Sequence, residues 1–218
     1  MGTPRIYPDR ETAGKELAAA LRARALQGPV AVLGLPRGGV PVAYPVACVL
    51  GAPLDVLIVR KIGMPGQPEY AVGALAMGDV LVWDPRFAHG DPDAAHTVHD
   101  ERMELARRER AYRRGRPPLD LKGRTVVLVD DGLATGLTMV AAVRSVFKAG
   151  AVRVLAAAPV ASKEAVALVE GEGAEAAVLQ TPPGLSSIGE WYGQFEQLDD
   201  EQVLRLLKKS RARPVQPV

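Results

Sequence analysis

The stretch that decides the fold is TVVLVDDGLATGLTMVAAV, residues 125–143. The apolar run Val126–Val129 predicts a buried strand, which leads directly into Asp130 and Asp131. A short loop of small residues and an apolar helix-like run follow. Adjacent carboxylates at the end of a buried strand repel each other, and burial of either is costly without a compensating partner. The pattern therefore indicates a ligand with hydroxyl groups, or a cation, at this strand end.

The loop from Ala134 to Thr138 predicts a phosphate site. Backbone N–H groups converge at the N-terminus of the following helix, where the helix dipole is positive, and Thr135 and Thr138 add hydroxyl donors. Gly136 lets the backbone approach an anion closely. The two aspartates just upstream would accept hydrogen bonds from neighbouring hydroxyls. Together these features predict a site for ribose 5-phosphate.

The rest of the chain alternates short apolar strands with helices. This order predicts an α/β fold, with a mainly parallel twisted sheet and helices on both faces. We expect one domain over residues 1–218, with a core at about 29–180 and a hood and tail at about 181–218. Strands are expected at 29–35, 54–59, 124–129, 152–158 and 175–179, a flexible loop with a hairpin at 62–83, and helices at 9–27, from 40 to Gly51, 91–114, 137–149, 162–171 and 199–209.

Composition bounds the function. The 218 residues are 48% apolar and 24% charged, enough for a real core. No apolar run reaches the ~18 residues of a membrane span, and the polar, proline-broken start does not match a signal peptide, so we expect a cytoplasmic protein without a membrane partner. One cysteine excludes an intramolecular disulfide. The net charge of +2 argues against nucleic-acid binding, and the absence of Asn suggests a thermophilic source.

Two other strand ends carry suggestive chemistry. In open α/β sheets, ligands bind at the carboxyl ends of the strands. The first strand leads into GLPRGG, residues 34–39, and the second ends at Arg60 and Lys61. Taken alone, PRGG could be an ordinary strand–helix turn, and the basic pair a solvated strand end.

Two charged clusters receive plainer interpretations. The arginine-rich segment 101–116 contains Glu104–Arg108 and Glu109–Arg113, pairs at helical i,i+4 spacing that neutralise the surface. We therefore expect a salt-bridged helix face rather than a nucleic-acid site. Three histidines, His89, His96 and His99, could imitate a metal site but lack supporting carboxylates in a known pattern, which favours solvated surface.

Residues 126–138, VVLVDDGLATGLT, resemble the phosphoribosyl pyrophosphate signature of type I phosphoribosyltransferases. In that family an early strand ends in a pyrophosphate-binding loop, which GLPRGG resembles, and the next strand ends in a basic pair. The resemblance covers about residues 29–160. The whole chain also looks like a group of little-characterised bacterial phosphoribosyltransferase-like proteins. It implies a homodimer that transfers the phosphoribosyl group from phosphoribosyl pyrophosphate to a nitrogen acceptor such as a nucleobase, with Mg²⁺.

The resemblance also implies roles for individual residues. Asp130, Asp131, Arg37 and Lys61 would be catalytic, because pyrophosphate departure leaves positive charge on the sugar and negative charge on the leaving group. Mg²⁺ would bridge ribose and pyrophosphate oxygens, with Asp131 an indirect ligand through water or substrate. The substrate-binding residues would be Pro36, Arg37, Gly38, Gly39, Arg60 and Lys61 for pyrophosphate, Asp130 and Asp131 for ribose, and Ala134, Thr135, Gly136, Leu137 and Thr138 for the 5-phosphate.

The acceptor stays open. Ala134 stands where the purine-salvage branch commonly has an acid, and the segment 63–79 lacks the basic residues of the orotate branch. Glu69 and Tyr70 are the ionisable groups of that segment before Asp79, so a general acid or base on it must be one of them. Trp191 could stack on a base in a hood at 181–197, or simply plug the edge of the core.

One alternative uses the same fold. A non-catalytic sensor of phosphoribosyl pyrophosphate would keep the ribose-phosphate loop and use the helix at 101–116 as a nucleic-acid surface. The presence of PRGG and of Arg60-Lys61 favours the enzyme, because a sensor needs the pyrophosphate site less. A P-loop or dinucleotide enzyme is excluded, since the chain has neither G-K-[S/T] nor GxGxxG after a strand.

Overall fold

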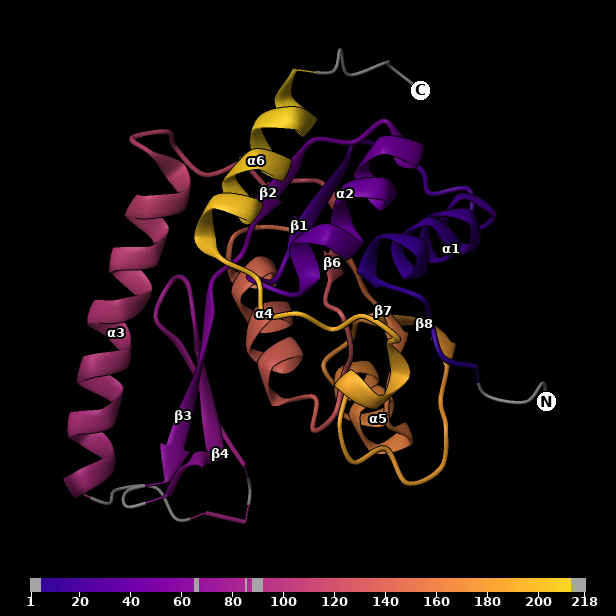
Figure 1. Cartoon of the computed structure of the whole chain (residues 1–218). Helices are drawn as coiled ribbons and strands as arrows, with labels where there is room; N and C mark the ends of the chain where they lie inside the picture. Colours follow the sequence, from indigo (N-terminus) through magenta and orange to yellow (C-terminus); the bar gives the residue numbers. More distant parts are fainter. Residues whose placement is uncertain (1–4, 65–66, 85, 88–91, 213–218) are drawn as a thin grey trace.

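The computed structural model describes residues 5–64, 67–84, 86–87 and 92–212, with the backbone alone for 67–71 and 92–94. Figure 1 shows the arrangement of the elements. The strands are β1 (Val30–Gly34), β2 (Leu54–Val56), β3 (Val59–Met64), β4 (Gln67–Ala76), β5 (Val80–Trp83), β6 (Thr125–Val129), β7 (Arg153–Val160) and β8 (Glu175–Gln180). The helices are α1 (Arg10–Arg22), α2 (Gly39–Leu50), α3 (Pro92–Arg113), α4 (Leu137–Lys148), α5 (Lys163–Gly171), the 3-10 helix η1 (Gly189–Trp191) and α6 (Asp200–Arg211).

The main sheet has five parallel strands in the order β2-β1-β6-β7-β8. The predicted parallel sheet is therefore confirmed. β1 and β6 are neighbours in register, with Gly34 opposite Val129. Because the two strands end side by side, the loops that follow them start next to each other.

Both faces of the sheet are covered, as the continuous apolar strands predict. On β6, Val126 and Leu128 point into the core beneath α4 and α5. Val127 and Val129 point to the other side, into the core shared with α1, α2 and α6. Alternation of side chains along a strand sends successive residues to opposite faces, so each strand supplies both cores.

Two helices begin at caps that the sequence encodes. The Asp9 carboxylate accepts a hydrogen bond from Thr12 N at 2.6 Å at the start of α1. Asp199 and Gln202 form a reciprocal capping box at the start of α6. The predicted extent of α1 to residue 27 is wrong, because the helix ends at Arg22 and Ala25 has a left-handed φ of 45°.

The expected strand 54–59 is also wrong, because it divides into two. β2 ends at Val56 in the main sheet, while β3 begins at Val59 and pairs antiparallel with β4. Arg60 and Lys61 therefore lie inside β3 rather than at the end of a main-sheet strand. The run LDVLIV contains no glycine or proline to mark the break, so its apolar pattern reads as continuous.

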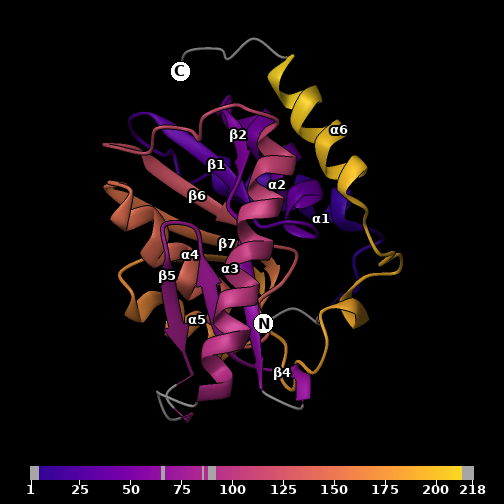
Figure 2. The ribbon, with the colours of Figure 1, turned by 90° about the vertical axis from the view of Figure 1, so that its left-hand side faces the viewer.

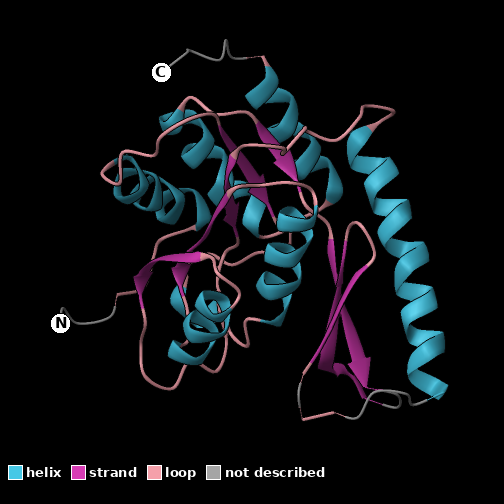
Figure 3. Cartoon of the chain, turned by 180° about the vertical axis from the view of Figure 1, so that it is seen from behind, coloured by secondary structure: helices cyan, strands magenta, loops and turns pink. Residues whose placement is uncertain are grey.

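β3, β4 and β5 form a separate antiparallel sheet, in the region where a hairpin was expected. Together with α3 it stands beside the main sheet, as the view from behind in Figure 3 makes plain. Figure 2 shows α3 running along this side of the molecule. Within the described ranges, no helix combines the length and apolar character needed to cross a membrane.

Candidate active site

The loop after β1 is packed tightly against the end of β6. Leu35 N donates to the Val129 carbonyl at 2.9 Å, and Gly39 N donates to the Leu35 carbonyl at 2.9 Å. The Pro36–Arg37 peptide bond between them is cis. A Cβ added to Gly38 would overlap Asp131 Oδ2, and one added to Gly39 would overlap the Val129 carbonyl oxygen. Two glycines are therefore needed for this loop to lie on the aspartate pair.

Asp130 continues the ladder of β6, because its N–H donates to the Ala157 carbonyl at 3.1 Å. Its Oδ1 accepts a hydrogen bond from Asp131 N at 2.9 Å. Burial of the carboxyl group raises the pKa of Asp130 well above its usual range, and the negative charge of Asp131 raises that pKa further. The ammonium of Lys61 opposes these effects only in part. Asp130 is thus primed for a ligand that supplies positive charge or hydrogen bonds.

Asp131 has a partner that its neighbour lacks. Arg10 Nε, at the start of α1, lies 2.8 Å from Asp131 Oδ2, and both side chains are largely buried. The Tyr192 hydroxyl donates to the Asp131 carbonyl at 2.6 Å, and burial raises the pKa of this hydroxyl, so it stays protonated. The segment after β8 therefore reaches the aspartate pair directly.

The predicted phosphate loop leads into α4. Gly136 caps the helix with φ 82°, a left-handed conformation that favours glycine. Ser162 Oγ donates to the Ala134 carbonyl at 2.7 Å and holds the loop from behind. Within the described chain, the N–H groups of residues 135–138 have no protein acceptor. Unpaired amides at the N-terminus of a long helix suit a phosphate group.

A cavity of about 740 Å³ opens in front of these loops. We call its main-sheet side the inner wall and its small-sheet side the outer wall. The inner wall consists of Leu35, Pro36, Asp130, Asp131 and Thr138, and the outer wall of Val59, Arg60, Lys61, Gly63, Met64, Thr97, Glu101 and Arg108.

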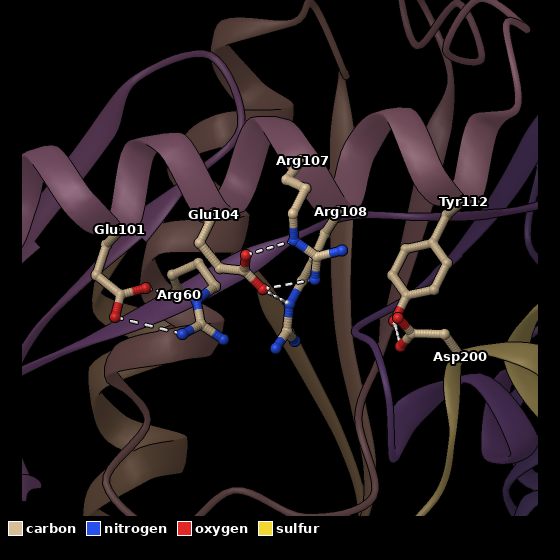
Figure 4. A network of polar contacts seen from close by, with 7 residues as sticks. All are labelled: Arg60, Glu101, Glu104, Arg107, Arg108, Tyr112 and Asp200. Atoms are coloured by element: carbon tan, nitrogen blue, oxygen red, sulfur yellow. Dashed lines mark hydrogen bonds and ion pairs between the residues drawn. The ribbon is translucent and has the colours of Figure 1, made fainter.

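The outer wall carries ion pairs between β3 and α3 and along α3 (Figure 4). Arg60 Nε lies 2.5 Å from Glu101 Oε2. Glu104 accepts hydrogen bonds from both Arg107 and Arg108, which lowers its pKa from 4.5 to about 2. Arg108 lines the cavity, so α3 adds a cation to the site.

The structure brings together most of the predicted site residues. Pro36, Arg60, Lys61, Asp130, Asp131 and Thr138 line one cavity. Gly38 and Gly39 pack against the aspartates, and Ala134, Thr135, Gly136 and Leu137 form the adjoining helix start. Arg37 follows Pro36 in the PRGG loop and is itself absent from the described lining of the cavity. The side chains of Glu69 and Tyr70 lie outside the described residues.

Trp191 lies in the segment that was expected to form a hood. It packs beside the buried cluster of Tyr7, Ala13 and Tyr192. Its indole Nε1 is buried without a hydrogen-bond partner among the described residues. Trp191 is absent from the described lining of the cavity, although its neighbour Tyr192 bonds to Asp131.

Sequence reasoning missed Arg10, Glu101 and Arg108 as site residues. Glu101 and Arg108 were part of a helix interpreted as charged surface, and the Glu104–Arg108 and Glu109–Arg113 pairs predicted there are present. Arg10 carried one usable signal. A basic residue in the first turn of a helix opposes the helix dipole, which suggests that another interaction holds it there.

Two of the three histidines lie in the described part of the chain. His96 and His99 are exposed on α3, and His89 lies outside the described residues. No group of three or more His, Cys, Asp or Glu side chains in the described ranges could hold a metal ion by itself.

Comparison with known proteins agrees with this geometry. The sequence profile of the "Phosphoribosyl transferase domain" family matches residues 6–172. A "Putative phosphoribosyl transferase" of Mycobacterium tuberculosis is 42% identical over 210 residues, which cover 94% of this chain and 47% of that protein. The chain thus spans about half the length of the curated relatives it matches.

Two solved structures extend the comparison. The protein TT1426 from Thermus thermophilus is 45% identical, with a TM-score of 0.78, over 94% of this chain and 98% of that one. A hypothetical protein from Neisseria gonorrhoeae with bound ppGpp is 16% identical, with a TM-score of 0.54, over 97% of this chain and 100% of that one. The second likeness shows the fold alone.

Proposed function

Because the chain belongs to the phosphoribosyl transferase domain family, we propose that it binds 5-phosphoribosyl 1-pyrophosphate and transfers the phosphoribosyl group to a nitrogen acceptor, releasing pyrophosphate. One observation carries the proposal. The PRGG loop and the aspartate pair are packed together on one side of a cavity whose other side carries Arg60, Lys61 and Arg108. Carboxylates that can accept hydrogen bonds from ribose hydroxyls therefore lie across the cavity from cations that can bind pyrophosphate.

The charges of the reaction match the two walls. When the bond between ribose C1 and the pyrophosphate oxygen breaks, positive charge develops on the sugar ring and negative charge on the leaving group. Asp130 and Asp131 on the inner wall favour the first, while Lys61 and Arg60 favour the second. Most of the rate enhancement would come from this placement, because no covalent intermediate with the protein is needed.

The carboxylate oxygens of Asp130 and Asp131 are the type of ligand that Mg²⁺ prefers. Mg²⁺ usually keeps several waters and binds through one or two carboxylates and substrate phosphates. The cavity offers that donor set, with Asp131 as the predicted indirect ligand. When bound, Mg²⁺ would neutralise charge on the departing pyrophosphate. The chain's own residues orient the sugar and the phosphates.

The acceptor nitrogen must lose its proton as it bonds to C1. We propose that Glu69 or Tyr70 acts as the general base that accepts this proton. β4 carries them between Gln67 and Ala71, whose partners on β3 are Met64 and Gly63. These two β3 residues line the cavity, so the backbone of β4 runs beside the outer wall. A nucleobase is the proposed acceptor class.

We propose Trp191 as an acceptor contact because of its neighbours in the chain. Ile188, shortly before it, packs on Gly132, and Tyr192, directly after it, bonds to Asp131. The Trp191→Ala variant should raise KM for the acceptor and leave phosphoribosyl pyrophosphate binding unchanged. A purely structural tryptophan would instead lower the melting temperature and leave that KM unaltered.

Calorimetry tests the proposal. The protein should bind phosphoribosyl pyrophosphate with Mg²⁺ and bind it much more weakly with EDTA. A pyrophosphate-release assay against a panel of nucleobases then identifies the acceptor. If neither phosphoribosyl pyrophosphate nor ribose 5-phosphate binds at millimolar concentration, the proposal is wrong. Binding without turnover on any nitrogen acceptor would favour the sensor.

A further inference from the structure

Arg10 stands at a point where three separate parts of the chain meet. It is the first residue of α1, and its side chain is 12% exposed. Its Nε bonds to Asp131 Oδ2 at 2.8 Å, in the loop after β6. Its Nη1 donates to the Glu196 carbonyl at 3.0 Å, and its guanidinium lies 3.8 Å from the centre of the Phe195 ring. One side chain thus connects the N-terminal helix, the aspartate pair and the segment after η1.

The ion pair fixes which oxygen of Asp131 is available to a ligand. Oδ2 is taken by Arg10 and is also the atom that Gly38 closely approaches. No described residue donates a hydrogen bond to Oδ1. Since Asp131 lines the cavity, Oδ1 is the oxygen left to accept from a sugar hydroxyl.

The ion pair also gives the two neighbouring carboxylates different electrostatic surroundings. Asp131 has an adjacent guanidinium, whereas Asp130 accepts a hydrogen bond from Asp131 N and has no ion-pair partner among the described residues. Two acids side by side are difficult to keep charged together without such a cation. A bonded and stacked guanidinium is well suited to this, because it remains charged and holds a fixed direction.

The position of Arg10 is unfavourable for the helix itself. A positive charge in the first turn opposes the helix dipole, and a largely buried guanidinium loses hydration. α1 already has its cap from Asp9, so the helix does not need Arg10 to begin. Its contacts instead reach Asp131 and, on the segment after η1, Phe195 and Glu196.

We propose that Arg10 is a positioning residue that holds Asp131 with Oδ1 directed at the ribose hydroxyls and supplies the charge that lets both aspartates lie together. The inference rests on the proposed function. It adds a residue outside the signature loops, from a different part of the chain, to the ribose end of the site. Arg10 acts through Asp131 and does not touch the pyrophosphate end.

The test separates the two ends of the substrate. Arg10→Gln should weaken binding of ribose 5-phosphate and of phosphoribosyl pyrophosphate by about tenfold or more, because a charge-assisted hydrogen bond is lost. Binding of magnesium pyrophosphate alone should stay within about twofold, a change of under ~0.5 kcal/mol. Lys15→Gln is the matched control, since it removes an exposed ion pair of the same helix. It should change none of the three affinities.

A double-mutant cycle shows whether Arg10 acts through Asp131. In an Asp131→Asn background, Arg10→Gln should have little further effect on ribose 5-phosphate binding. If it costs the same factor there, Arg10 acts elsewhere and the inference is overturned. Equal weakening of pyrophosphate and ribose 5-phosphate would likewise indicate a general structural role and overturn it.

Two further variants protect the test against misfolding. Arg10→Met replaces the guanidinium beside Phe195 with an uncharged, unbranched side chain, and it is used if the Gln variant does not fold. Arg10→Lys restores the charge, and its ribose 5-phosphate affinity should lie between those of the Met variant and the wild type. A Lys variant as weak as Met overturns the role of charge. If wild-type protein binds none of the ligands, the proposed function itself fails.

Discussion

The inner and outer walls of the cavity are built in different ways. The inner wall joins two loops of the main sheet by backbone hydrogen bonds and by glycines that leave no room for a side chain. The outer wall lies on a second sheet and a long helix, joined by the pair of Arg60 and Glu101. Close backbone packing fixes the inner wall, whereas the outer wall combines buried apolar side chains of β3, β4 and α3, such as Ile62, Leu75 and Leu105, with partly exposed ion pairs.

This difference predicts how strongly substitutions in each wall should change the stability of the protein. Overpacking a close backbone contact costs about 1–3 kcal/mol, whereas an exposed ion pair contributes about 0–1 kcal/mol and weakens with salt. Substitutions in the inner wall should therefore affect folding and ligand binding together. Removal or screening of the outer-wall ion pairs, by substitution, salt or acid, should change the stability by small amounts.

The largest effect is expected for Gly39→Ala. Its Cβ would overlap a carbonyl oxygen and lie 2.9 Å from Asp130 Cα, and backbone atoms cannot rotate away. We expect a loss of about 1–3 kcal/mol in the free energy of unfolding, measured with urea. Gly171→Ala is the control, because its added Cβ meets nothing within 4 Å and alanine at this helical position should not destabilise the protein. A stable Gly39→Ala variant would refute the close packing of the inner wall.

Asp130→Asn should raise the free energy of unfolding at pH 7, in contrast to Gly39→Ala. The pKa of Asp130 is raised in the folded protein, so the native state binds more protons than the unfolded state above about pH 4, and stability falls as pH rises through that range. Asn keeps an acceptor for Asp131 N without the charge. At pH 7 we expect a gain of about 0.5–2 kcal/mol, which disappears below about pH 4. Urea unfolding at the two pH values measures it, and a loss of stability at pH 7 would contradict the raised pKa.

Asp131→Asn should have a different effect from Asp130→Asn, although both residues belong to the inner wall. It removes the partner of Arg10 and leaves a largely buried cation, so it should lower the melting temperature at pH 7. Thermal unfolding of both variants provides the check. Equal shifts would mean that the two aspartates do not differ as their contacts indicate.

Removal of an ion pair in the outer wall should lower the stability less than Gly39→Ala does. Arg60→Gln removes the pair with Glu101, whose side chains are 25% and 20% exposed, and should reduce stability by up to about 1 kcal/mol at low salt. The difference from wild type should shrink at molar salt concentration, where screening is strong. The more exposed Arg102–Asp79 pair supplies a control, Arg102→Gln, with a smaller change. A larger loss for Arg60→Gln that salt does not alter would show that Arg60 stabilises the protein by packing rather than by its charge.

The smallest effect concerns acid. Hydrogen bonds from Arg107 and Arg108 lower the pKa of Glu104 to about 2, so its contribution is present above its unfolded pKa of about 4.5 and is lost as pH falls toward 2. Glu104→Gln should cost less than about 1 kcal/mol at pH 7 and nothing at about pH 2. Unfolding curves at the two pH values measure this. A cost that persists in acid would show that packing, not charge, is lost.

The main features of the inner wall can be predicted from the sequence. The run Val126–Val129, the aspartate pair and the helix start at Gly136 are local signals, since each depends on neighbours within a few residues. Strand and helix periodicity also predicted the parallel sheet and its two covered faces. These features follow from backbone preferences and from the burial of apolar side chains, which act at short range along the chain.

The other contacts of the site depend on how distant parts of the chain pack together. Nothing near Val56 in the sequence shows that the chain leaves the main sheet and that Arg60 and Lys61 face the cavity from β3. Arg10 meets Asp131 across 121 positions, and Tyr192 meets it across 61. Such contacts depend on how finished elements pack, because a side chain finds its charge or hydrogen-bond partner only where the fold places one.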